Sequence, residues 1–140
     1  MDEPRVADFM TEQPYTVHAG EPLELAKALM QEHGIRHLPV VNNRTVVGML
    51  SERDLNLALG LEGVNRGKLV VMDICHGRPY VVKPDARLRE VAAEMAVRYI
   101  GSAMVMEGTR LAGIFTTVDA CRALAALLRP PQPCAADTDH

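Results

Sequence analysis

The sequence is poor in aromatic residues and carries no large excess of charge. It has no tryptophan, two phenylalanines and three tyrosines in 140 residues, so aliphatic side chains and eight methionines must fill its core. A net charge of −3 provides no basic surface for nucleic acid or an anionic membrane. Three cysteines without a Cys-x-x-Cys pair indicate a reducing compartment rather than a disulfide framework. The composition predicts a soluble cytoplasmic protein of one domain or of two small units.

Long apolar runs and targeting signals are also missing. No run approaches the roughly 20 apolar residues that a membrane-spanning helix needs. The N-terminus, "MDEPRVADFM", is acidic where a signal peptide would be basic. We therefore expect neither a membrane span nor a signal peptide.

Sets of reactive or metal-binding side chains are absent from the sequence as well. There is no Ser/His/Asp set, no metal triad and no glycine-rich phosphate loop. His33 and His37 are four residues apart, but Gly34 is expected to end the helix between them. Cys75 and His76 are adjacent and therefore point in different directions. We expect no enzyme, no metal site and no required cofactor.

What the sequence does contain is an internal repeat with a period of 65 residues. In this register Val6–Leu55 aligns with Val71–Ala120 without a gap, and "GMLSERDL" at Gly48 falls on "GIFTTVDA" at Gly113. Identical residues occupy 12 of 50 aligned positions: Val6/Val71, Asp8/Asp73, Pro14/Pro79, Tyr15/Tyr80, Val17/Val82, Leu23/Leu88, Ala28/Ala93, Met30/Met95, Ile35/Ile100, Val40/Val105, Gly48/Gly113 and Asp54/Asp119. A gapless match of this extent indicates a duplication.

Both copies predict the order β-α-β-β-α. A short extended piece ("YTVH" or "YVVK") precedes a helix of apolar period 3.6, then two β runs joined by a turn, and a last helix that starts at Ser51 or Thr116. We predict an α+β fold with α/β-type layers, in which the two repeats pack as a pseudo-twofold pair. The expected boundaries are a first repeat at 1–60, a linker at 61–67, a second repeat at 68–128 and a disordered, proline-rich tail at 129–140.

This repeat resembles the cystathionine-β-synthase (CBS) domain, and two in tandem resemble the Bateman module. The resemblance rests on the G-h-h-[ST]-x-x-D pattern (h, apolar) at each strand-to-helix junction and on "IRHLPVV" upstream of the first one. It covers about 120 of the 140 residues, so we expect a stand-alone tandem module.

The repeated hydroxyl-x-x-aspartate has two interpretations. It is a capping box, in which the hydroxyl and the carboxylate satisfy free amides at a helix start. It is also suited to a nucleotide, because a helix N-terminus attracts phosphate. In CBS domains that bind nucleosides, the aspartate holds the ribose and the hydroxyl lies near the phosphate, which the resemblance implies for both copies here.

The resemblance also implies that each ligand site combines the aspartate of one copy with segments of the other. The stronger expected site joins Thr16, Val17, Arg36, His37 and Pro39 to Thr116 and Asp119. The weaker expected site joins Ser51, Arg53 and Asp54 to Val81, Val82, Gly101, Ser102 and Met104. We rank them in this order because the basic pair Arg36–His37 and the proline have no counterparts in "IGSAMVM".

The function expected from these sites is regulatory sensing of an adenosyl ligand. AMP, ADP or ATP is favoured, and S-adenosylmethionine or an NAD-type ligand remains open. Binding would change the angle between the repeats and report energy state to a protein partner. The alternative is a dimerising interaction module with degenerate, unoccupied pockets. We also expect a homodimer, because "ALAALL" at Ala123–Leu128 is apolar enough to be buried against another chain.

Overall fold

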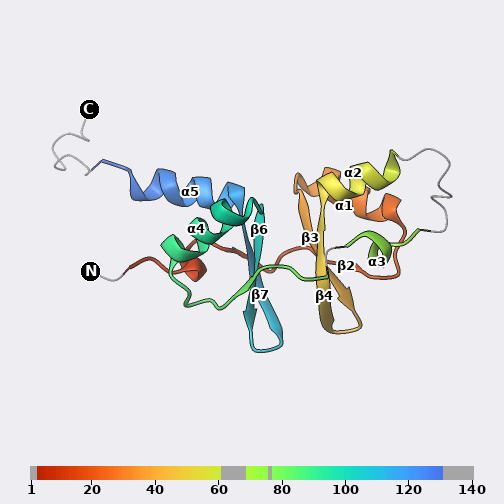
Figure 1. Cartoon of the computed structure of the whole chain (residues 1–140), viewed down its shortest axis with the longest axis horizontal. Coiled ribbons are helices and arrows are strands. Elements are labelled where there is room, and N and C mark those ends of the chain that lie inside the picture. The colour runs from red at the N-terminus through yellow and green to blue at the C-terminus, as the bar shows by residue number, and fades with distance from the viewer. Residues whose placement is uncertain (1–2, 61–68, 76, 131–140) are drawn as a thin grey trace, which may run out of the picture.

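The structure is a computed structural model that describes residues 3–60, 69–75 and 77–130. Within these residues it has five α-helices and two small mixed β-sheets, so the expected α+β class is confirmed. The two sheets lie next to each other at the centre, and the helices lie on their outer sides (Figure 1). The expected linker at 61–67, and the tail beyond Pro130, lie outside the described residues.

The first sheet has the order β2-β3-β4, with β2 parallel to β3 and β3 antiparallel to β4. Its elements are β2 (Val17–His18), α1 (Leu23–His33), β3 (His37–Asn42), β4 (Thr45–Ser51) and α2 (Glu52–Leu59). Helix α1 ends at Gly34, which adopts the left-handed conformation at φ 64° as the sequence predicts.

The second sheet repeats this arrangement and adds one strand, in the order β1-β7-β6-β5. Its elements are β1 (Thr11–Glu12), β5 (Val81–Val82), α4 (Leu88–Arg98), β6 (Ser102–Glu107), β7 (Arg110–Thr116) and α5 (Thr117–Leu127). The β-α-β-β-α order is present in both copies. The pairing of β1 with β7 was not predicted from the sequence.

The N-terminal segment of each sequence repeat packs on the other repeat. The first, which contains the 3₁₀ turn η1 (Val6–Asp8), lies beside α4, and the amide of Val6 donates to the carbonyl of Ala86 at 2.8 Å (Figure 1). The equivalent helix α3 (Val71–Ile74) lies on the first repeat, where the amide of Val71 donates to the carbonyl of Glu21 at 2.9 Å. The repeats expected at 1–60 and 68–128 are therefore interlocked.

Each repeat completes its apolar core with a residue from the N-terminal segment of the other repeat. Val71 is fully buried in the core of the first repeat and Val6 in that of the second. A third, smaller cluster of Met49, Met104 and Ile114 joins the strands of the two repeats. The methionines predicted to fill an aromatic-poor core are buried at positions 30, 49, 95 and 104.

Candidate ligand-binding cleft

Asp119 is held inside the protein by groups of the chain itself. Its residue is only 2% exposed. The carboxylate accepts from the Thr116 amide at 3.0 Å and from the Thr11 hydroxyl at 3.0 and 3.2 Å, and Arg122 lies 3.4 Å away. We call these four residues the Asp119 cluster. Thr116 and Asp119 form a capping box at the start of α5, which is the first of the two interpretations of the repeated motif.

The Thr11 contact depends on strand β1. Thr11 pairs with Ile114 of β7, and its carbonyl oxygen lies 2.5 Å from the position that a Cβ on Gly113 would occupy. Glycine at this position is therefore needed for the close approach of β1. The glycine of the repeated motif thus lets the N-terminal strand reach Asp119.

Asp54 is placed differently, although it occupies the same position in the motif. The Ser51 hydroxyl accepts from the Asp54 amide at 3.1 Å and so caps α2. The Asp54 residue is partly exposed, and its carboxylate makes no hydrogen bond or ion pair with residues 3–60, 69–75 or 77–130. It is available to a ligand.

Asp54 lines a cavity of about 320 Å³ to which both repeats contribute residues, and we call it the Asp54 cleft. Helix α2 and strands β3 and β4 provide one side, and residues around β5, α4 and β6 provide the other. The lining residues are His37, Met49, Ser51, Arg53, Asp54, Arg78, Pro79, Tyr80, Arg98, Tyr99, Ile100 and Ser102. The volume is at the lower end of the range of about 300–1,000 Å³ typical of small-molecule sites.

The cleft includes four of the eight residues in the weaker expected site: Ser51, Arg53, Asp54 and Ser102. The other four do not line it. Val82 and Met104 are buried in the core, Val81 is half exposed on β5, and Gly101 accepts a hydrogen bond from Thr117 at 3.2 Å. His37, expected in the other site, lines this cleft instead.

The remaining residues of the stronger expected site are dispersed. Val17 and Pro39 are buried, whereas Thr16 and Arg36 are exposed. Arg36 lies 3.8 Å from Glu52, and its side chain does not line the Asp54 cleft. The structure thus brings Thr116 and Asp119 together. Neither of them lines the Asp54 cleft, whereas His37 does.

Three arginines give the Asp54 cleft its electrostatic character. Arg53, Arg78 and Arg98 line it, against the single carboxylate of Asp54. The guanidinium of Arg98 lies over the Tyr80 ring, 5.0 Å from its centroid, and 3.9 Å from Glu94. Burial, aided by the nearby carboxylate of Glu94, raises the pKa of Tyr80, so its hydroxyl stays protonated.

His37 differs from the basic residue that the sequence suggested. Burial lowers its pKa below 6.5, the positive charge of Arg36 lowers it further, and Glu52 opposes this in part. The ring is therefore neutral near pH 7. A neutral imidazole can donate or accept a hydrogen bond, and the positive charge among the lining residues comes from the arginines.

Tyr80, Arg98 and Arg78 were not recognised from the sequence as site residues. The 65-residue register pairs Tyr80 with Tyr15 and Arg98 with His33, so the two positions could have been compared between the repeats. The Tyr15 and His33 rings are stacked on each other, with centroids 3.7 Å apart. The aligned positions thus form a ring–ring pair in one repeat and a cation–π pair in the other.

Metal ligation and membrane insertion are two other properties on which the described residues bear. Across the ranges that the structure describes, no group of three or more His, Cys, Asp or Glu residues is arranged to hold a metal ion. Over the same ranges, no helix has the length and apolar character needed to cross a bilayer.

Comparisons with known proteins agree with this architecture. The family model for the CBS domain matches twice, at residues 6–60 and 71–126, so the chain belongs to the CBS domain family as a tandem pair. An inosine-5'-monophosphate dehydrogenase of Korarchaeum cryptofilum is 34% identical over 116 residues, which are 82% of this chain and 23% of that protein. This chain therefore spans less than a quarter of that relative.

Two solved structures show the same pair. A Vibrio cholerae protein given the name AcuB is 31% identical with a TM-score of 0.81, and the match covers 93% of this chain and 100% of that one. CBSX2, solved in complex with AMP, is 26% identical with a TM-score of 0.79, and covers 89% of this chain and 98% of its own.

Proposed function

We propose that this chain is a regulatory module that binds an adenosine phosphate (AMP, ADP or ATP) in the Asp54 cleft. The observation that carries the proposal is the Asp54 carboxylate, which has no partner among the described residues, on a cavity lined by Ser51 and three arginines. A carboxylate can accept from both hydroxyls of a ribose, and guanidinium groups bind phosphate. The AMP complex of CBSX2 supports the choice of ligand class.

The charge and size of the cleft favour this ligand over the alternatives. S-adenosylmethionine carries a sulfonium cation, which three guanidinium groups would repel. A dinucleotide such as NAD needs more room than a cavity of about 320 Å³ provides. The preferred ligand is therefore an anionic mononucleotide.

Binding would act through the contact between the repeats and not through a chemical reaction. The cleft takes residues from both repeats, whose strands also meet at Met49, Met104 and Ile114. A ligand that contacts both sides stabilises one relative arrangement over others, in proportion to its differential affinity. We propose that a protein partner in the cytoplasm reads this arrangement as a measure of energy state.

A thermal-shift series tests the ligand class. AMP, ADP and ATP should each raise the melting temperature, since a ligand at 100 times its Kd stabilises the folded state by about 2.7 kcal/mol. S-adenosylmethionine and NAD should give smaller shifts at equal concentration. The proposal is wrong if no adenosine phosphate shifts the transition, and the chain is then better described as an interaction module with unoccupied pockets.

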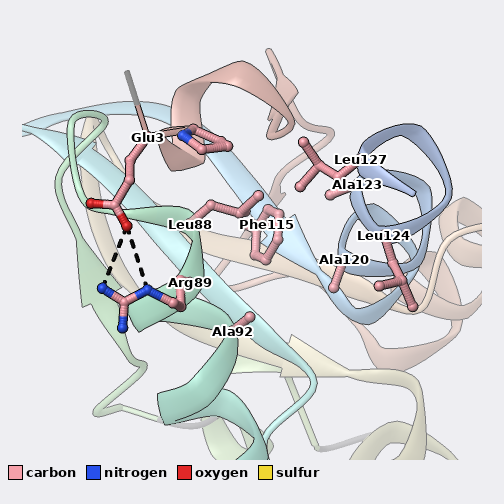
Figure 2. Close-up of a pocket in the computed structure, with 10 residues that line it drawn as sticks. Glu3, Leu88, Arg89, Ala92, Phe115, Ala120, Ala123, Leu124 and Leu127 are labelled. Carbon is pink, nitrogen blue, oxygen red and sulfur yellow. Dashed lines mark hydrogen bonds and ion pairs between the residues drawn. The ribbon is translucent and has the colours of Figure 1, made fainter. Parts of the chain in front are cut away.

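We further propose that the module is a homodimer formed through α4 and α5. A groove of about 320 Å³ between these helices is lined by Leu88, Ala92, Phe115 and Ala123, with Leu124 and Leu127 on its α5 side (Figure 2). Leu124, Leu127 and Leu128 are each more than half exposed. An apolar face of this kind is typical of a surface that another chain covers.

Sedimentation velocity tests the dimer. Leu124→Asp together with Leu127→Asp should convert a dimer into a monomer, because each buries a charge in an apolar contact. The exposed Leu57→Asp on α2 serves as the matched control. A wild-type protein that sediments as a monomer at every concentration would rule the dimer out.

A further inference from the structure

Tyr99 has an unusual backbone conformation at the edge of the Asp54 cleft. It ends helix α4 in the left-handed region, at φ 54° and ψ 44°. The aligned residue of the other repeat is Gly34, which ends α1 at φ 64° and ψ 34°. Glycine adopts this conformation without a steric cost, whereas a residue with a Cβ is disfavoured there by roughly 1–2 kcal/mol.

No side-chain contact of Tyr99 with the described residues compensates for this cost. Tyr99 is 95% exposed, the highest value among the large apolar side chains described as exposed. Its side chain makes no hydrogen bond or ring contact within the described residues. Strained residues of this kind tend to occur where a ligand or partner uses the side chain.

The position of Tyr99 indicates which molecule uses it. Tyr99 lines the Asp54 cleft together with Tyr80 and Ile100 of the second repeat, and Ser51 and Asp54 of the first repeat line it as well. Two tyrosines line the cleft. One face of the Tyr80 ring is covered by the Arg98 guanidinium, whereas Tyr99 is 95% exposed. The arginines, Ser51 and Asp54 suit phosphate and ribose, and a planar base is the remaining part of a nucleotide.

We propose that the Tyr99 ring stacks on the base of the nucleotide and closes the mouth of the Asp54 cleft. This inference rests on the proposed function of the cleft. It adds a residue that contacts the base, and Gly34 provides no such ring at the aligned position of the other repeat. Stacking on an aromatic side chain is sequence-tolerant, so Tyr99 contributes to affinity for a nucleotide rather than to the choice among bases.

The test compares AMP with ribose 5-phosphate, which lacks the base, on the wild type and on Tyr99→Gly. Calorimetric titration should show that Tyr99→Gly weakens AMP binding by about tenfold, within the range of base stacking. Ribose 5-phosphate, measured by competition with AMP, should bind both proteins equally. The melting temperature of Tyr99→Gly should equal or exceed that of the wild type, because glycine fits the left-handed conformation.

Three further variants complete the test. Tyr99→Phe should retain AMP affinity, and Tyr99→Asn, which also tolerates this backbone conformation, should lose it as glycine does. Val97→Ala removes an exposed apolar side chain outside the cleft and should bind like the wild type.

The outcomes separate this inference from the function on which it rests. If Tyr99→Gly binds AMP like the wild type, or loses AMP and ribose 5-phosphate equally, the stacking role is refuted while the nucleotide site stands. If the wild type binds neither AMP nor ribose 5-phosphate, the proposed function fails, and the stacking role fails with it.

Discussion

The N-termini of α2 and α5 carry the same motif but use its aspartate in different ways. Asp119 is buried and receives hydrogen bonds from Thr11 and Thr116, whereas the Asp54 carboxylate is partly exposed at a cavity. The difference comes from a strand distant in sequence, because β1 brings Thr11 to Asp119 across 108 positions. A repeated motif therefore predicts local geometry in both copies, but the element packed against it decides whether a ligand can reach it.

The largest expected effect is on folding stability at the Asp119 cluster. Asp119→Ala should lower the free energy of unfolding by about 2–3 kcal/mol, because it removes charge-assisted hydrogen bonds and a helix cap. Asp54→Ala is the matched control and should cost less than about 1 kcal/mol, since its carboxylate makes no hydrogen bond or ion pair with the described residues and only favours the N-terminus of α2. Urea denaturation of both variants measures the difference. Equal losses would mean that the two aspartates have equivalent structural roles.

An intermediate effect is expected from the charge of the Asp54 cleft. Arg98→Gln should weaken AMP binding about fivefold, because one cation near the phosphate is lost, and should leave adenosine binding unchanged. Arg44→Gln, in the turn between β3 and β4, removes an equal charge away from the cleft and serves as the control. A parallel loss for adenosine would show that Arg98 acts through its packing on Tyr80 instead.

The smallest expected effect is a pH dependence from His37. Burial lowers its folded pKa below 6.5, so the unfolded chain takes up the proton first as the pH falls. Stability should therefore decrease as the pH drops below about 6.5, by at most about 1.4 kcal/mol per pH unit from this residue. His37→Gln should remove that part of the slope in denaturation curves measured across this range. An unchanged slope would mean that His37 titrates alike in both states.

The sequence was sufficient to predict the fold. The gapless repeat, the period of the apolar residues and Gly34 as a helix end are local signals, and the structure contains the elements they indicate. The exchange of N-terminal segments was not predicted, because β1 has only two residues and its partner lies in the other repeat. Short strands carry too little periodicity to reveal a partner.

The sequence was less informative about the site. It identified Ser51, Arg53, Asp54 and Ser102, which the structure places on one cavity, but it ranked the Asp119 site first. That ranking relied on Arg36, His37 and Pro39, which the family resemblance joins to Asp119 and which have no counterparts in "IGSAMVM". Burial of the Asp119 carboxylate cannot be read from such a pattern. Tyr99 also lines the cleft and was not identified, because nothing in its sequence context predicts a tyrosine in the left-handed backbone conformation.

The ligand affinities of two variants test the central claim most directly, that the Asp54 cleft and not the Asp119 cluster binds the nucleotide. AMP would be titrated calorimetrically into the wild type, Asp54→Ala and Asp119→Ala, at a temperature where all three are folded. Each charge-assisted hydrogen bond to the ribose contributes about 1.5–3 kcal/mol, so Asp54→Ala should lose at least about tenfold in affinity. Asp119→Ala should bind AMP like the wild type. The opposite pattern, with affinity lost in Asp119→Ala and retained in Asp54→Ala, would contradict the account.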